Sequence, residues 1–230
     1  MRIRVDDAAR ETDVGDRHLQ LPVIGRRIRQ TIRELATMTF LGDAEPGEAA
    51  RRMCEEDEAE DGYVWDATKL WAHQPELHGQ FEAVIAAASN AAGLSNREKA
   101  MLVIGQAVAI GDSYCCIAWS RWLAEWGESA ETALAAVLED EAPFNDRERA
   151  LARWARVVAK TPNDATAADV ERLRGVGFDD AQILALTLYT TLRMALSSTN
   201  DALGAHPDLA LAETIAPAVR EAITWGRQPA

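Results

Sequence analysis

Two adjacent cysteines are the residues of this sequence most suited to chemistry. Cys115 and Cys116 lie in the stretch GDSYCCIAWSR, residues 111–121. A cysteine thiolate attacks peroxides, and the resulting sulfenic acid condenses with a second thiol to form a disulfide. A bridge between adjacent residues is disfavoured because their Cα atoms lie only about 3.8 Å apart, closer than in ordinary disulfides. Both side chains are also typical of small apolar residues packed at a helix start.

The residues ahead of Cys115 influence its reactivity. A helix that begins after Asp112 places Cys115 in its first turn, where free backbone amides favour the thiolate. The carboxylate of Asp112 has the opposite effect, because it repels a thiolate. The sequence therefore leaves open the direction in which the pKa of Cys115 is shifted.

Three tryptophans follow on one face of the same expected helix. Trp119, Trp122 and Trp126 are spaced i, i+3 and i+7, which places them side by side on a helix. Such a face is typical of a core or a subunit interface. It would also form the wall of a pocket for an organic substrate.

The histidines do not form a metal motif. His73 and His78 are five residues apart, whereas two histidines that chelate a metal from one helix face are four apart. Pro75 lies between them and leaves the local helix start open. We expect His73 to cap or pack, with a pocket residue as the alternative, and we expect neither a metal nor a cofactor.

Composition favours an all-α protein. The chain has 230 residues, of which 48% are hydrophobic and 6% aromatic, and its apolar residues are mainly helix-favouring Ala and Leu, with Val. A net charge of −13 and a pI near 4.8 disfavour nucleic-acid and membrane partners. The N-terminus has no apolar signal segment and the cysteines are odd in number, so we expect a cytoplasmic protein with reduced thiols.

One helical domain over residues 23–230 is expected to position these residues. A polar arm precedes it at 1–22, and its first helix covers 25–38. The acidic stretch 42–62, which contains a proline and two early glycines, is interpreted as a surface connection. A helix from Ile183 is apolar on most faces, which favours burial or a subunit interface, and we expect a homo-oligomer (dimer, trimer or hexamer).

Two segments resemble each other and indicate an internal duplication of a helical unit. Residues 94–109 read LSNREKAMLVIGQAVA and residues 144–159 read FNDRERALARWARVVA. Each has a Ser or Asn ahead of an Arg-Glu pair, which suits a helix N-cap followed by negative charge in the first turn. Chance similarity between two alanine-rich helices is the alternative.

The stretch from Leu94 to Trp122 resembles the alkylhydroperoxidase D and carboxymuconolactone decarboxylase superfamily. That superfamily reads Leu-Ser-x-Arg-Glu-x-Glu, an apolar helix, Asn-Gly-Cys-x-Tyr-Cys, and a histidine four residues later. This chain reads LSNREKAMLVIGQAVAIGDSYCCIAW over residues 94–119. Flanking segments are similar to its peroxidase-related branch, over roughly residues 65–208 in all. The resemblance implies an alkylhydroperoxidase D-like helical bundle.

The resemblance ends at the positions that carry the superfamily's chemistry. When Cys115 is aligned with the second cysteine, three catalytic positions hold other residues: Asp112 for the first cysteine, Trp119 for the histidine and Ala100 for the proton-relay glutamate. An alignment one residue later, on Cys116, fills these positions with Ser113, Ser120 and Met101. Neither alignment restores the set, so Cys115 alone supplies only the first step of the redox cycle.

Three hypotheses follow. The first is a small-molecule enzyme of lyase, isomerase or cyclase type that acts on a small organic substrate and has lost the thiol redox set. Its candidate residues are Asp112 as acid or base, Tyr114 as a hydrogen-bond donor, and Trp119, Trp122, Cys116 and His73 as the pocket. The second is a one-cysteine peroxidase that uses Cys115 and an external resolving thiol. The third is a non-catalytic helical oligomer or binding module.

Overall fold

The structure is a computed structural model that describes residues 39–44 and 47–230. These residues form helices and their connections, with no strand among them, which confirms the predicted all-α class. They belong to one compact unit. The predicted arm 1–22, the helix over 25–38 and the domain boundary after residue 22 lie outside the described residues.

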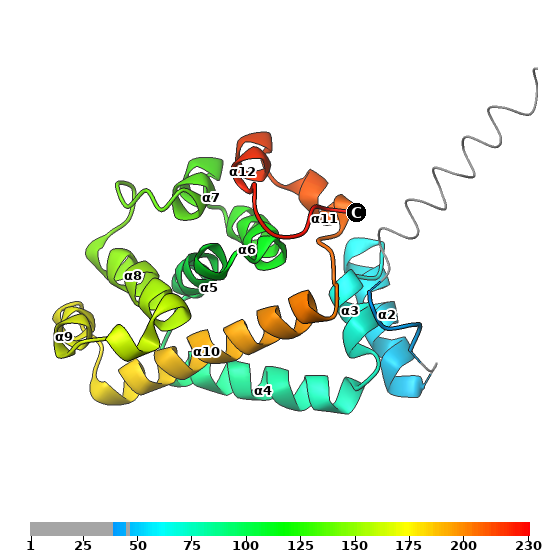
Figure 1. Cartoon of the computed structure of the whole chain (residues 1–230), viewed down its shortest axis with the longest axis horizontal. Helices are drawn as coiled ribbons and strands as arrows, with labels where there is room; N and C mark the ends of the chain where they lie inside the picture. Colours follow the sequence, from blue (N-terminus) through cyan, green and yellow to red (C-terminus); the bar gives the residue numbers. More distant parts are fainter. Residues whose placement is uncertain (1–38, 45–46) are drawn as a thin grey trace, which may run out of the picture. The chain divides into compact units, whose positions relative to one another are not determined.

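The helices labelled α2 to α12 in Figure 1 follow one another along the described chain. Their bounds are α2 Glu48–Asp61, α3 Asp66–Trp71, α4 Pro75–Ala91, α5 Asn96–Ile110, α6 Ser113–Glu125, α7 Ala130–Val137, α8 Asp146–Lys160, α9 Ala167–Gly175, α10 Asp180–Ala202, α11 Leu209–Thr214 and α12 Pro217–Ala222, with a short 3-10 helix at Pro162–Asp164. None of the helices described is both long and apolar enough to cross a membrane.

The acidic stretch 42–62 is not the predicted surface connection, because most of it forms α2. Glutamate favours helices, and most of the glutamates of this stretch lie on the solvent side of α2. Two of its aspartates bind the following loop: Asp57 accepts the backbone N–H of Trp65 at 2.9 Å, and Asp61 accepts the indole N–H of Trp65 at 2.6 Å. The acidic residues therefore keep one face of α2 in solvent and bind the helix to the loop that follows it.

The crossing of α5 and α8 lies at the centre of the fold. The helices approach closely because Gly105 has no side chain: a Cβ there would lie 3.2 Å from the carbonyl oxygen of Ala152 and 3.4 Å from the Cβ of Ala155. Gly105 and Ala155 occupy equivalent positions of the two similar segments. The segments thus pack on each other at matching residues.

Reciprocal ion pairs join the starts of these two helices. Arg97 of α5 pairs with Glu148 of α8, and Arg147 of α8 pairs with Glu98 of α5. Each glutamate also closes the capping box of its own helix. This equivalence of contacts is what an internal duplication of a helical unit produces.

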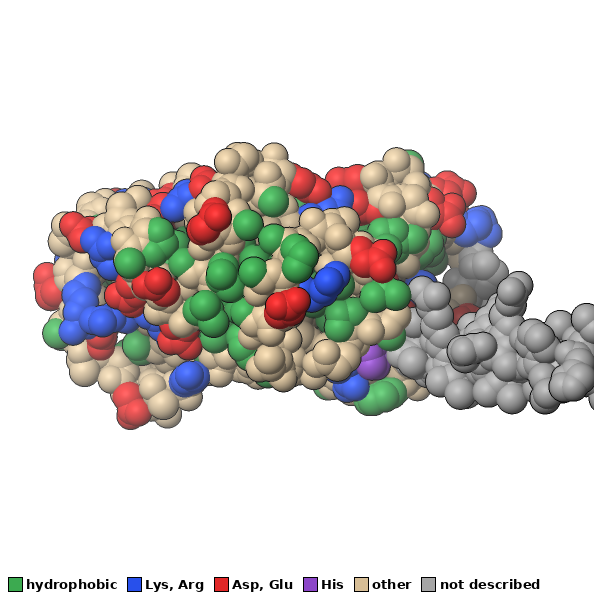
Figure 2. Space-filling view, turned by 90° about the horizontal axis from the view of Figure 1, so that it is seen from above, with side chains coloured by type: hydrophobic (Ala, Val, Ile, Leu, Met, Phe, Trp, Pro, Cys, Tyr) green, Lys and Arg blue, Asp and Glu red, His purple; other side chains and the backbone are tan. Residues whose placement is uncertain are grey.

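The long helix α10 runs beside α4 and also packs on α5 and α8 (Figure 1). Ile183, Leu186 and Leu196 are buried there, as expected of an apolar helix, but Leu184 is 72% exposed. On the face of the molecule in Figure 2, acidic and basic side chains are interspersed around apolar ones, so the charge on that face is not gathered into a single patch.

The C-terminal residues pack on the start of α6. Gly226 has φ +69, and a Cβ there would lie 2.6 Å from Oγ of Ser113, so a larger residue would collide with the helix start. Ser113 also donates a hydrogen bond to the carbonyl of Arg227 at 2.6 Å. The end of the chain therefore covers the turn from which α6 begins.

Candidate functional site

The α6 helix begins where the sequence predicts. Gly111 turns the chain with a left-handed conformation, and Asp112 is the N-cap of α6. Oδ1 of Asp112 accepts the backbone N–H of Cys115 at 3.0 Å, which satisfies one free amide of the first turn. Oδ2 of Asp112 is buried and has no hydrogen-bond partner in the described part of the chain.

Cys115 is a buried, protonated thiol. Burial raises the pKa of Cys115 well above its ordinary value, and the Asp112 carboxylate raises it further. The charge of Arg193 and a hydrogen bond with Ser197 lower the pKa of Cys115 without offsetting burial. The structure therefore gives the direction of the pKa shift of Cys115, which the sequence leaves open. The thiol form prevails at neutral pH.

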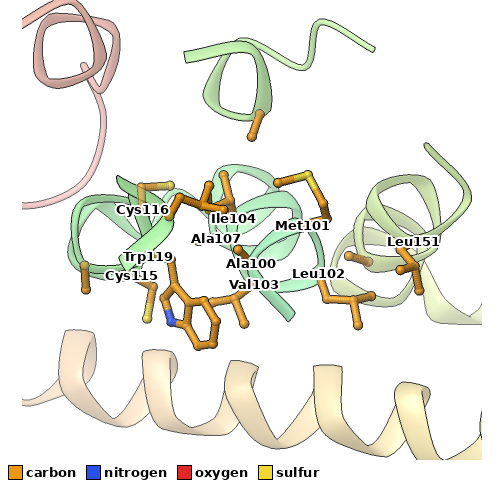
Figure 3. Close-up of a cluster of buried hydrophobic side chains, with 14 of the residues drawn as sticks. Ala100, Met101, Leu102, Val103, Ile104, Ala107, Cys115, Cys116, Trp119 and Leu151 are labelled. Carbon is orange, nitrogen blue, oxygen red and sulfur yellow. The ribbon is translucent and has the colours of Figure 1, made fainter. Parts of the chain in front are cut away.

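Two pairs of side chains meet where α6 faces α10. Sγ of Cys115 lies 3.3 Å from Oγ of Ser197, and the guanidinium carbon of Arg193 lies 5.2 Å from the ring centroid of Trp119. Cys115 and Trp119 are four residues apart on α6, and their partners Ser197 and Arg193 are four residues apart on α10 in the opposite order. The contacts therefore align as they do between antiparallel helices. In Figure 3 the side chains of Cys115 and Trp119 both point toward the α10 ribbon.

Several polar atoms around Cys115 have no hydrogen-bond partner among the described residues. Besides Oδ2 of Asp112, they are Nε1 of Trp119, Nε of Arg193 and Oε1 of Gln106. The amide of Gln106 is held only by a long hydrogen bond from Nε2 to Ser197, at 3.4 Å. Because buried polar groups are usually paired, this concentration of unpaired atoms distinguishes the surroundings of Cys115 as a candidate site.

Tyr114 points to a different partner. Its hydroxyl donates to Oδ2 of Asp208 at 2.7 Å, and Oδ1 of Asp208 accepts the backbone N–H of Asp66 at 3.0 Å at the start of α3. Burial raises the pKa of Asp208 to about 6. The structure thus places Tyr114 in a closed network that joins α6, α3 and the loop before α11.

The other candidate residues lie around α6 in different surroundings. Trp122 stacks on Trp65 at 6.1 Å between ring centroids, and it meets Trp119 edge to face at 5.0 Å. Trp126 is 40% exposed. Cys116 is fully buried, and its side chain points away from Cys115 (Figure 3). The predicted face of tryptophans is confirmed, and only Trp119 adjoins Arg193.

His73 and Cys54 lie apart from Cys115 and the unpartnered polar groups around it. The Nε2 atom of His73 lies 2.9 Å from the carbonyl oxygen of Gly42, and His73 lines a groove of about 500 Å³ between α2 and the start of α4. Neither Cys115 nor any of the polar groups around it lines this groove. All three cysteines are free thiols. Among the described residues, no group of His, Cys, Asp and Glu could hold a metal ion.

Sequence reasoning missed the α10 half of the site. Arg193, Ser197 and Asp201 are polar residues spaced four apart on an apolar helix, and this spacing was an available signal of one polar stripe. Burial and the carboxylate of Asp112 together raise the pKa of Asp201 to about 6, against the lowering effect of Arg227. A carboxyl group with a raised pKa therefore lies within electrostatic reach of Asp112.

The fold resembles known structures, although no model of a known protein family and no curated protein matches the sequence. An alkylhydroperoxidase D core, an uncharacterised peroxidase-related protein from Ralstonia eutropha, has a TM-score of 0.65 at 22% identity, covering 84% of this chain and 98% of its own. A peroxidase-related protein from a Silicibacter species has a TM-score of 0.63 at 21% identity over 74% and 92%.

A third similar structure is the debrominase Bmp8, in a variant crystallised with 2,3,4-tribromopyrrole. It has a TM-score of 0.62 at 15% identity, and the match covers 75% of this chain and 93% of that one. At these identities the comparisons establish the fold alone. The chain has the alkylhydroperoxidase D-like fold, which confirms the fold predicted from the sequence.

Proposed function

We propose that the protein is a small-molecule enzyme that transfers a proton through Asp112 and does not use a thiol redox cycle. The observation that carries this proposal is the unpartnered Oδ2 of Asp112, a buried acceptor at the helix start that holds the superfamily's first cysteine position. A carboxylate that is fixed by one oxygen and free at the other is placed to accept or donate a proton.

The environment of Cys115 argues against thiol catalysis. A peroxidase thiol needs thiolate character, and burial together with Asp112 raises the pKa of Cys115. The resolving step needs a second thiol within reach, but Cys116 faces the other side of α6. The positions of the histidine and the glutamate hold Trp119 and the fully buried Ala100, neither of which transfers protons at neutral pH.

The remaining groups favour a reaction of an organic molecule by proton transfer, as in a lyase, isomerase or cyclase. Trp119 and Trp122 provide apolar surface beside the helix start, and Asp201 is a second carboxyl group close enough to interact with Asp112. The debrominase that shares the fold was crystallised with a brominated pyrrole, so an organic ring is a reasonable class of substrate for this chain.

The first test asks whether Cys115 reacts with peroxide. We expect mild hydrogen peroxide, followed by a sulfenic-acid probe and mass spectrometry, to label the half-buried Cys54 before Cys115, because Cys115 is buried and protonated. Early sulfenylation of Cys115, with peroxide consumption lost in Cys115→Ser, would instead establish the one-cysteine peroxidase.

The second test measures proton transfer in a way that does not require the natural substrate. Proton NMR in D₂O follows deuterium incorporation or product formation in a panel of conjugated carbonyl compounds. Asp112→Asn preserves the N-cap and should lower the rate at least about a hundredfold, whereas Cys115→Ser and the exposed control Asp146→Asn should retain it. The proposal fails if no panel member exchanges, or if loss follows Cys115 instead of Asp112.

A further inference from the structure

We propose that Arg193 and Trp119 form the binding site for a small planar organic anion, a conjugated carboxylate, which is the substrate class of the enzyme proposed above. This inference rests on that proposed function and adds the charge and shape of the ligand. It depends on three features of the described residues: the bonding of Arg193, the surface of Trp119, and the spacing between Trp119 and Asp112.

Arg193 is a buried cation without a hydrogen-bonded acceptor. The residue is 8% exposed, and its Nε is buried without a hydrogen-bond partner among the described residues. Its nearest carboxylate is that of Glu82 on α4, at 4.0 Å, which is 41% exposed. A buried charge that lacks a close partner destabilises the folded protein. A ligand carboxylate would supply this partner, because two of its oxygens match the planar guanidinium.

Another arginine of this chain, Arg121, has the close carboxylate partners that Arg193 lacks. Arg121 also lies over a tryptophan ring, with its guanidinium carbon 5.8 Å from the centroid of Trp65. In contrast to Arg193, it makes ion pairs with both Asp61 and Glu125. Arg121 thus joins α6 to α2 within the protein, whereas the hydrogen-bonding capacity of Arg193 is unused.

Trp119 accounts for the planar shape. Its side chain lies under the guanidinium of Arg193, and its Nε1–H is buried without a partner among the described residues. An indole offers a flat apolar face to a conjugated molecule and one N–H to an acceptor oxygen. A carboxylate beside Arg193 would use that N–H as well, so one ligand group would satisfy both unpartnered donors.

The spacing along α6 limits the size of the ligand. Asp112, which we propose as the proton-transferring group, precedes Trp119 by seven residues, or about 10 Å along a helix. A single ring with a short unsaturated side chain and a terminal carboxylate is about this long. Glu82 is half exposed, so a ligand would reach the guanidinium from the α4 side.

The test uses trans-cinnamate as the probe, with trans-cinnamamide as the neutral molecule of the same shape. Binding is measured by isothermal titration calorimetry and by the shift in Tm. We expect cinnamate to bind at least tenfold more tightly than the amide to the unaltered protein. Arg193→Met should lower cinnamate affinity at least tenfold while leaving the Tm of the free protein unchanged or higher, because it removes a buried charge whose nearest carboxylate is 4.0 Å away.

Arg121→Met is the matched control. It should lower the Tm of the free protein, because it breaks two ion pairs, and leave cinnamate affinity unchanged. The inference is overturned if cinnamate does not bind at millimolar concentration, if the amide binds equally well, or if Arg193→Met lowers Tm as much as Arg121→Met does. Deuterium exchange that depends on Asp112 would survive each of these results, so failure here is distinct from failure of the proposed function.

Discussion

Two buried polar groups lie on neighbouring faces of the first turn of α6, and they differ in how completely they are bonded. On one face, Tyr114 donates to Asp208, which also accepts the backbone N–H of Asp66. On the other, Cys115 makes one contact with Ser197, at 3.3 Å, and Nε of Arg193 is buried without a hydrogen-bond partner within the described chain. Tyr114 and Cys115, whose side chains point about 100° apart on the helix, thus lie in one fully bonded and one incompletely bonded environment.

Under the proposed function, the difference separates groups that hold the fold from groups that bind a ligand. A buried hydrogen bond within a satisfied network stabilises the folded state, and its loss leaves a partner unsatisfied. An unpaired buried group lowers stability, and a protein retains such a group where function uses it. We therefore expect substitutions on the Asp208 side to affect unfolding, and substitutions of Asp112 and Arg193 on the other side to affect catalysis and binding.

The largest expected effect is that of Asp208→Ala. It removes the acceptor of both Tyr114 and the backbone of Asp66, so we expect the free energy of unfolding to fall by about 3 kcal/mol. Asp112→Ala removes an N-cap but also an unpaired oxygen, and should cost only about 1 kcal/mol. Urea denaturation measures both. Equal losses of unfolding free energy in the two variants would contradict the distinction between the two faces of α6.

The pH dependence of stability should also depend on Asp208. Its pKa in the folded protein is about 6 against an ordinary value of 3.8, so the unfolded chain releases this proton first as pH rises. Stability should therefore fall between about pH 4 and pH 6 and change little above, by on the order of 1–2 kcal/mol. Asp208→Asn should remove most of this slope in urea titrations. Asp201, whose pKa is also raised to about 6, is half-buried and should account for the smaller slope that remains.

Tyr114→Phe should cost about 1 kcal/mol, because it removes a single hydrogen bond to Asp208. Tyr63→Phe is the matched control: the Tyr63 hydroxyl is buried without a partner among the described residues, so its removal should be neutral or slightly stabilising. Thermal unfolding of the two variants measures the difference. A larger loss for Tyr63→Phe would mean that its hydroxyl has a role in the fold that its bonding does not indicate.

The α6 half of the site could be predicted from the sequence because its signals are local. The spacing from Asp112 to Cys115 is that of an N-cap and its bonded amide, and the tryptophan spacing defines one helical face. The same locality explains the predicted starts of α5 and α8, whose capping boxes span only four residues. Local patterns thus gave the helices and their first turns.

The partners of these residues could not be predicted, because they come from distant parts of the chain. Asp208 is 94 residues from Tyr114, and Ser197 is 82 residues from Cys115. The direction of the Cys115 pKa shift depended on burial, which only the packing of α6 against other helices supplies. The interpretation of residues 42–62 as a connection was wrong because an acidic run is compatible with one solvated helix face as well as with a loop.

The smallest expected effect is that of Ser197→Ala. Its hydrogen bond with Gln106 is long, at 3.4 Å, and its contact with Cys115, at 3.3 Å, involves a thiol, which is a weak donor and acceptor, so both contribute little to stability. We expect the free energy of unfolding to change by less than about 0.5 kcal/mol, because the variant removes weak contacts from a region that is already incompletely bonded. The hydrogen bond from Ser197 lowers the pKa of Cys115, so alkylation of Cys115 should become slower still. A loss as large as that of Tyr114→Phe would show that the contacts between α6 and α10 also hold the fold, and would remove the proposed distinction between the two faces of α6.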